Sequence, residues 1–168
     1  CGIKAVNEIA YAKEKGIDFI ICDHHVPDDV LPPAVAILNA KRPDATYPYE
    51  HLSGCGVGFK FMQAFAMNNG IEFYQLTPLL DLVAVSVASD IVPIMGENRV
   101  LTYHGLKQLN SNPSVGLKAI IDVCGLTDKD ITVGDIVFKI GPRINASGRI
   151  QNGKEAVELL VEKDISTA

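Results

Sequence analysis

The spacing of apolar residues changes along the chain, which predicts helices that alternate with short buried strands. Residues 3–16 carry apolar side chains at helical spacing and end at Gly16. Residues 17–22, IDFIIC, are apolar at almost every position, as in a parallel strand that is covered on both faces. Residues 34–40, AVAILNA, predict a second strand.

Helical patterns dominate the remainder of the chain. The expected helices cover residues 56–70, 77–89, 97–110, 115–125 and 153–164. The second is apolar nearly all round and is expected to be central, with Thr77 as its N-cap and Pro78 in its first turn. The third is expected to be a surface helix, with Val100, Leu101 and His104 near one stripe. This order predicts the α/β class: a parallel sheet flanked by helices, continuing into a helical connecting segment.

Composition narrows the classes of protein that are possible. The chain has 168 residues, enough for one domain with a sizeable core, and no apolar run is long enough to span a bilayer. A formal net charge of −5 argues against a wholly basic nucleic-acid module, although a local basic groove remains compatible with it. The four cysteines are far apart and form no CxxC pair, so we expect reduced thiols and no structural zinc.

The first expected strand ends in Asp23, His24 and His25. Ligands of doubly wound sheets bind outside the carboxyl ends of the strands. A sensible division of roles makes one histidine a metal ligand and the other a contact for a substrate anion, with the aspartate orienting an imidazole. The alternative is a polar loop with two solvated histidines.

A second carboxylate, Asp90, follows the apolar helix at 77–89. A buried carboxylate there is costly unless it is hydrogen-bonded or bound to a metal, whereas an aspartate exposed just beyond the helix is common. Together with the DHH tripeptide, Asp90 supplies the nitrogen and oxygen ligands that hold Mn²⁺ or Mg²⁺ in phosphoryl-transfer sites.

Residues 141–150, GPRINASGRI, have the composition of an anion-binding segment. They combine Arg143, Asn145 and Arg149 with two glycines and contain no acidic residue. The glycines indicate a backbone turn near the site. The alternative is a helix-breaking connector with solvated arginines.

Residues 52–61, LSGCGVGFKF, place three glycines at the entry to a helix. No strand directly precedes them, so a dinucleotide fingerprint is a weak interpretation. A helix start that faces an anion and tight helix packing are about equally good interpretations.

Four segments in this order, DHH, LSGCGVGFKF, VASDIVPIMGENR and GPRINASGR, resemble the DHH phosphoesterase superfamily and, within it, the family of RecJ-type single-stranded-DNA exonucleases. The resemblance implies hydrolysis of single-stranded DNA from the 5′ end, with Mn²⁺ or Mg²⁺, in DNA repair and recombination. The alternatives are a DHH phosphodiesterase acting on short RNA or cyclic dinucleotides, and an inactive DHH-like module that binds nucleic acid.

The resemblance also implies roles for individual residues. His24 and Asp90 match metal ligands of the family, His25 matches the second histidine near the scissile phosphate, and Asp23 supports the site as part of the catalytic motif. Because His24 and Asp90 both match ligands of one ion cluster, we expect them to approach each other across the carboxyl end of the sheet. In the intact parent, two divalent ions would activate water and stabilise the charge that develops on the phosphoryl group.

The same resemblance extends to the nucleic acid and to other partners. Arg143, Asn145 and Arg149 fall where the family approaches the nucleic-acid path. The expected partner is single-stranded DNA, with a single-strand-binding protein or a helicase as candidate partners of the parent, in the cytoplasm and away from membranes.

The chain departs from the family pattern at its beginning. The aspartate cluster that forms the family's first motif is absent, and the chain starts at CGI, directly after the position of a metal-binding aspartate in the second motif. We therefore interpret the chain as an internal fragment with an incomplete metal site, expected to be inactive alone. Residues 1–112 would be the C-terminal part of the DHH catalytic domain, and residues 113–168 the helical connection towards a further domain.

Overall fold

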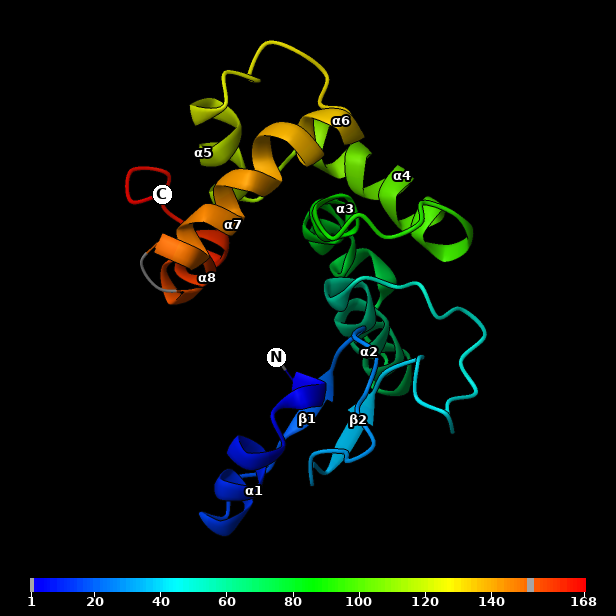
Figure 1. Ribbon diagram of the computed structural model, residues 1–168. Coiled ribbons are helices and arrows are strands. Elements are labelled where there is room, and N and C mark those ends of the chain that lie inside the picture. The colour runs from blue at the N-terminus through cyan, green and yellow to red at the C-terminus, as the bar shows by residue number, and fades with distance from the viewer. Residues whose placement is uncertain (1, 151–152) are drawn as a thin grey trace.

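The computed structural model describes residues 2–150 and 153–168, with the side chains of residues 147–150 excepted. The chain forms a curved arrangement in which α1 and the sheet lie at one end, α3 near the centre and α7 and α8 at the other end (Figure 1). The helices are η1 (Gly2–Lys4), α1 (Val6–Glu14), α2 (Gly54–Asn68), η2 (Phe73–Gln75), η3 (Thr77–Leu79), α3 (Leu80–Ser89), α4 (Gly96–Ser111), α5 (Val115–Val123), α6 (Val133–Asp135), η4 (Ile136–Ile140), α7 (Gly141–Ile150) and α8 (Gly153–Val161). None of the helices in the described ranges has both the length and the apolar character needed to cross a bilayer.

The sheet contains two parallel strands, β1 (Ile20–Cys22) and β2 (Ala36–Leu38), which confirms the predicted α/β class. Ile21 of β1 is buried, but its neighbour Ile20 is 53% exposed. The expectation that both faces of this strand are covered is therefore wrong within the described chain. Successive side chains point to opposite faces of a sheet, and only the face of Ile21 is packed.

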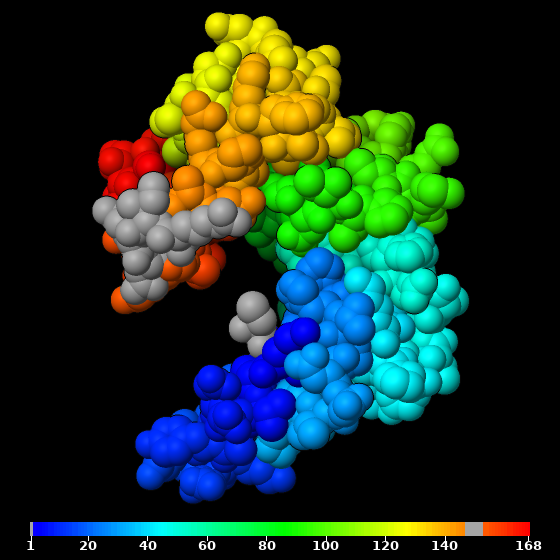
Figure 2. Space-filling view, viewed as in Figure 1, coloured from blue at the N-terminus to red at the C-terminus, as the bar shows by residue number. Residues whose placement is uncertain are grey.

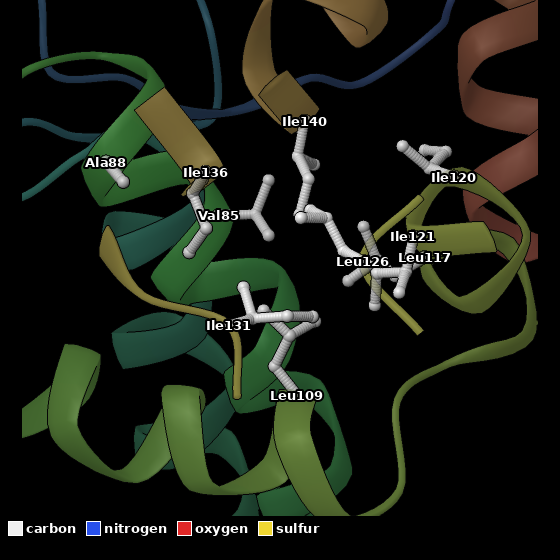
Figure 3. Close-up of a cluster of buried hydrophobic side chains, with 10 residues drawn as sticks. All are labelled: Val85, Ala88, Leu109, Leu117, Ile120, Ile121, Leu126, Ile131, Ile136 and Ile140. Atoms are coloured by element: carbon white, nitrogen blue, oxygen red, sulfur yellow. The ribbon is translucent and has the colours of Figure 1, made fainter. Parts of the chain in front are cut away.

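Helix α3 lies between two hydrophobic clusters and contributes to both, as its apolar sequence predicts. One cluster surrounds Val83 and Val87 and includes Phe59 of α2. The other joins Val85 and Ala88 to the helices that follow (Figure 3). Its buried members are Val85, Ala88, Leu109, Leu117, Ile120, Ile121, Leu126, Ile131, Ile136 and Ile140. The buried residues of this second cluster come from both sides of the domain boundary predicted at 112–113. That boundary stays a prediction.

Helix α4 packs on α3 through one face and leaves the expected stripe on another. Val100, Leu101 and His104 line one hollow together, and Val100 and His104 are exposed, as expected for a surface helix. The buried positions are Asn98, Thr102, Gly105 and Leu109. Small and polar residues form this face because the two helices approach closely: a Cβ added at Gly105 would overlap the carbonyl oxygen of Leu80.

The beginnings of two helices also differ from the expectation. Helix α2 begins at Gly54, where the side chain of Ser53 caps it by accepting a hydrogen bond from the backbone N–H of Gly56. Thr77 is not the N-cap of α3. Its hydroxyl donates to the carbonyl of Tyr74, and a 3₁₀ turn, η3, precedes the α-helix.

The segment GPRINASGRI is helical, so the predicted backbone turn is wrong. Helices α6, η4 and α7 form one continuous helical run in which residues Ile136–Ile140 make a π-helical turn. Pro142 explains the irregularity, because proline has no N–H to donate to the carbonyl four residues earlier and its ring clashes with that carbonyl. A π turn just before proline lets the helix continue.

We predict opposite effects for two glycine substitutions in these helices. Gly105→Ala is expected to lower the free energy of unfolding by about 1–3 kcal/mol, because the new methyl group meets Leu80 and lies 2.6 Å from Cβ of Ala84. Gly58→Ala, in α2, meets no atom within 4 Å and is expected to raise it by about 0.5–1 kcal/mol. Urea denaturation followed by circular dichroism measures both, and equal effects would contradict the packing described here.

Candidate metal centre

Asp23 organises the end of β1 from a buried position. Its Oδ2 accepts a hydrogen bond from the backbone N–H of Ile3 at 2.8 Å. Its Oδ1 accepts from the backbone N–H groups of His24 (2.7 Å) and His25 (3.1 Å), and lies 2.6 Å from Nδ1 of His25. Burial alone would raise the pKa of this carboxyl, but the hydrogen bonds hold it well below its usual range. Because Oδ1 is already surrounded by donors, Asp23 is suited to position its neighbours.

His25 is held at its backbone and at one ring nitrogen. Asn39 donates a hydrogen bond from Nδ2 to the carbonyl of His25 at 2.8 Å. Since ionised Asp23 can only accept, Nδ1 of His25 carries the proton of their shared hydrogen bond. The side chain is 54% exposed, which leaves Nε2 available to a ligand. This arrangement can bind a phosphoryl oxygen when the ring is protonated, or accept a proton when it is neutral.

The side chain of His24 is less exposed to solvent than that of His25, at 15% against 54%. Burial lowers its pKa, and the nearby carboxylate of Asp90 opposes this effect. Metal binding requires the neutral imidazole, which burial favours. Nδ1 of His24 is buried and has no hydrogen-bond partner among the described residues, a costly state for a polar atom.

Asp90 lies at the C-cap of α3. Its N–H donates to the carbonyl of Ser86, and its Oδ2 accepts a 3.3 Å hydrogen bond from the Ser86 hydroxyl. The side chain is 39% exposed, so the carboxylate lies just beyond the helix and is not buried within it. The C-terminal end of a helix carries partial negative charge, which makes this an unfavourable place for an anion unless a cation is nearby.

The predicted approach of His24 and Asp90 is confirmed. Nε2 of His24 lies 3.8 Å from Oδ2 of Asp90. This separation is too long for a hydrogen bond. It fits two ligands of one ion, because atoms about 2.1 Å from Mg²⁺ lie at most about 4.2 Å from each other. The favoured neutral imidazole and the carboxylate at a helix C-terminus both suit a divalent cation between Nε2 and Oδ2.

The tripeptide Asp23, His24 and His25 also places potential ligand atoms within 4.8 Å of one another. We nevertheless favour His24 and Asp90 as the ligand pair. The hydrogen bonds of Asp23 occupy its Oδ1, and Nδ1 of His25 is committed to the same carboxylate. Whether His24 and Asp90 bind a metal stays a prediction.

The glycine-rich segment meets this centre at the beginning of α2. A Cβ added at Gly54 would lie 3.5 Å from Cδ2 of His24, so the first turn of the helix lies beside the imidazole. Strand β2 ends at Leu38, well before α2 begins, and the strand–turn–helix context of a dinucleotide fingerprint is therefore missing here.

The segment GPRINASGRI contacts the last turn of α3 through its first residue. A Cβ added at Gly141 would lie 2.6 Å from Oγ of Ser89, the residue before Asp90. Arg143 lies on a different side of α7 and donates from Nη1 to the carbonyl of Lys139 at 2.9 Å. The structure therefore does not bring Arg143 to the DHH tripeptide.

The other two residues predicted in this segment have different outcomes. Asn145 is exposed and follows Gly141 by one helical turn, on the same face of α7. The side chain of Arg149 lies outside the described residues. The roles of both residues in binding nucleic acid stay predictions.

Sequence reasoning missed a group of contacts next to the centre. Tyr49 and Asn98 hydrogen-bond to the segment that follows Asp90. Asn98 could have been noticed because residues 98, 102, 105 and 109 share one helical face. Three of these four residues are polar or lack a side chain, so the pattern of apolar residues did not reveal it.

The chain was compared with known proteins. The family model described as "DHH family, N-terminal domain" matches residues 1–87, which is more than half of the chain. The single-stranded-DNA-specific exonuclease RecJ of Bacillus subtilis is 40% identical over 97% of the chain and 20% of its own length. RecJ of Thermus thermophilus in complex with Mn²⁺ has a TM-score of 0.82 at 30% identity, covering 99% of this chain and 24% of that one. The corresponding complex with Mg²⁺ has a TM-score of 0.72 at 28% identity, covering 90% and 22%.

These similarities define the family but not a whole protein. The chain spans about a fifth of the Bacillus relative and about a quarter of the Thermus chain. The family model covers the DHH tripeptide and ends at residue 87, whereas the similarity to the two RecJ proteins extends past Asp90 over nearly the whole chain. The chain belongs to the DHH family, and its similarity to RecJ covers almost its full length.

Proposed function

We propose that this chain is part of a metal-dependent exonuclease that hydrolyses single-stranded DNA from its 5′ end. The observation that carries the proposal is the 3.8 Å separation between Nε2 of His24 and Oδ2 of Asp90. The RecJ relatives support it, since solved structures of RecJ are complexes with Mn²⁺ or Mg²⁺.

Each residue of the centre has a distinct task in this proposal. His24 and Asp90 would hold Mn²⁺ or Mg²⁺, and a bound ion would stabilise charge on the phosphoryl group. His25 would contact a phosphate oxygen through Nε2, while Asp23 fixes the orientation of its ring. Water, phosphate oxygens and residues outside this chain would fill the remaining coordination positions.

The shape of the molecule suits a polymeric substrate. A broad recess lies between the N-terminal part and the C-terminal helices (Figure 2). Gly141 lies against Ser89 beside the candidate ion, and the same face of α7 continues to exposed Asn145. We propose that a DNA strand runs from the DHH tripeptide along this face, with its phosphates near Asn145.

In the full-length protein, we expect His24→Ala and Asp90→Ala each to lower the Mn²⁺-dependent rate of single-stranded-DNA hydrolysis by at least about 100-fold, because each removes an ion ligand. The control is His104→Ala, which removes an exposed histidine of α4. Release of nucleotides from 5′-labelled oligonucleotides measures rate and polarity. Wild-type rates in both site variants would refute the metal assignment. Hydrolysis restricted to short RNA or cyclic dinucleotides would refute the substrate.

Asp23→Asn tests the positioning role of the buried carboxylate. The folded-state pKa of Asp23 is lower than its unfolded value, so the carboxylate stabilises the protein above about pH 4 and this stabilisation is lost as the pH falls towards the folded-state pKa. We expect the free energy of unfolding of the variant to be at least about 2 kcal/mol lower than that of the wild type at neutral pH. Its deficit relative to the wild type should shrink below about pH 4.

Urea denaturation across this pH range provides the measurement. Asp18→Asn, at an exposed position before β1, serves as the control and should have little effect on stability. A deficit of Asp23→Asn that stays constant down to about pH 2 would contradict the proposed ionised hydrogen-bond acceptor.

Two substitutions in α7 distinguish the face along which DNA would lie. We expect Asn145→Ala to weaken single-stranded-DNA binding several-fold, because its side chain is exposed on the face shared with Gly141. Arg143→Ala should change DNA affinity little, since Arg143 lies on a different side of α7 from Gly141 and Asn145. Fluorescence anisotropy at several salt concentrations measures both. A decrease of about one in the log–log salt slope for Arg143→Ala would instead show a phosphate contact.

A further inference from the structure

Two segments that are distant in the sequence are joined beside the candidate metal centre. Asn98 is completely buried, and its Nδ2 donates to the carbonyl of His51 at 2.6 Å and to that of Pro93 at 3.0 Å. The hydroxyl of Tyr49 donates to the carbonyl of Met95 at 2.7 Å and lies 3.2 Å from that of Pro93. We call Tyr49 and Asn98, with these contacts, the latch.

The latch connects the two sides of the proposed ion site. Residues 49–52 lead directly to Ser53, the N-cap of α2, and the first residue of this helix lies beside the ring of His24. Residues 91–95 leave directly from Asp90. The latch therefore joins the segment next to one candidate ligand to the segment next to the other.

The segment after Asp90 has an unusual backbone, which the latch holds in place. Ile91 has a φ angle of 53°, a left-handed conformation that is strongly disfavoured for a β-branched residue, although its side chain is 80% exposed. Gly96 also has a positive φ, and a Cβ there would lie 2.7 Å from the ring of Tyr49. Strained backbone persists only where surrounding contacts fix it, and such contacts cluster at functional sites.

Asn98 is also not optimised for stability alone. Its Oδ1 is buried without a hydrogen-bond partner among the described residues. A buried polar group that is only partly satisfied lowers stability and requires a specific explanation. Fixing two segments at the ion site provides one.

We infer that Asn98 and Tyr49 are positioning residues that set the separation of His24 and Asp90 for metal binding, an inference that rests on the proposed function. Ligand atoms of one ion lie at most about 4.2 Å apart, so little room remains above the observed 3.8 Å. Loss of the latch would free the segment after Asp90 and widen the distribution of this distance.

The test measures Mn²⁺ affinity in the full-length protein by electron paramagnetic resonance, together with the melting temperature. Asn98→Leu removes the amide while keeping the number and branching of the side-chain heavy atoms, and it is expected to weaken Mn²⁺ binding by about 10-fold or more. Asn110→Leu is the matched control on the same helix. Asn110 also links α4 to a distant segment, donating to the carbonyl and accepting from the N–H of Ile131, but it lies away from the centre. The Asn110→Leu substitution should lower the melting temperature while leaving Mn²⁺ affinity unchanged.

Tyr49→Phe provides a second variant that removes only one hydroxyl. It is expected to weaken Mn²⁺ binding several-fold and carries the test if Asn98→Leu does not fold. A positioning defect should also be overcome by excess metal, so the hydrolysis rate of both variants should recover at high Mn²⁺ concentration. A rate that stays low at saturating Mn²⁺ would overturn the inference.

His24→Ala separates this inference from the function on which it rests. If His24→Ala leaves Mn²⁺ affinity unchanged, the proposed metal site is wrong. If His24→Ala abolishes binding while Asn98→Leu and Tyr49→Phe bind Mn²⁺ like the wild type, the metal site stands and the positioning role is wrong. Equal losses of Mn²⁺ affinity in Asn98→Leu and Asn110→Leu would also overturn the positioning role, because equal losses would indicate general destabilisation.

Discussion

An apolar helix of ten residues has to be covered on every side, and the arrangement of the described chain follows from the covering of α3. Helix α4 covers it closely because Gly105 has no side chain, and the helical run that contains Gly141 meets its last turn at Ser89. The chain leaves α3 at its polar end, and Asp90 lies there. Burial of one helix thus determines where a carboxylate meets the histidines that follow β1.

The candidate centre distributes its hydrogen bonds unevenly. Asp23 is saturated with donors and remains ionised, whereas His24 keeps a buried nitrogen without a partner in the described chain. A protein optimised only for stability would pair such an atom. The contrast separates a group that maintains the local structure from a histidine that is not optimised for stability alone.

The sequence was sufficient to predict features that depend on one segment or on simple chemistry. The parallel strands and the central helix belong to this class, whereas the meeting of His24 with Asp90 was predicted from the family resemblance. The buried face of α4 was missed because its members are Asn, Thr, Gly and Leu, and close helix contact favours small residues over apolar ones. The latch was missed because it joins side-chain amide and hydroxyl groups to backbone carbonyls, which no pattern of residue types encodes.

The π-helical turn before Pro142 has a consequence for the comparison of related sequences. Through this turn Ile136, Ile140 and Ile144 face the core at a constant interval of four, with Val137 beside them, whereas an undistorted α-helix would drift by about 40° at each such step. A relative that lacks the turn would need one residue fewer to present the same face of α7. A single-residue gap in an alignment at this point would therefore preserve the orientation of the helix, and a gapless alignment would rotate it.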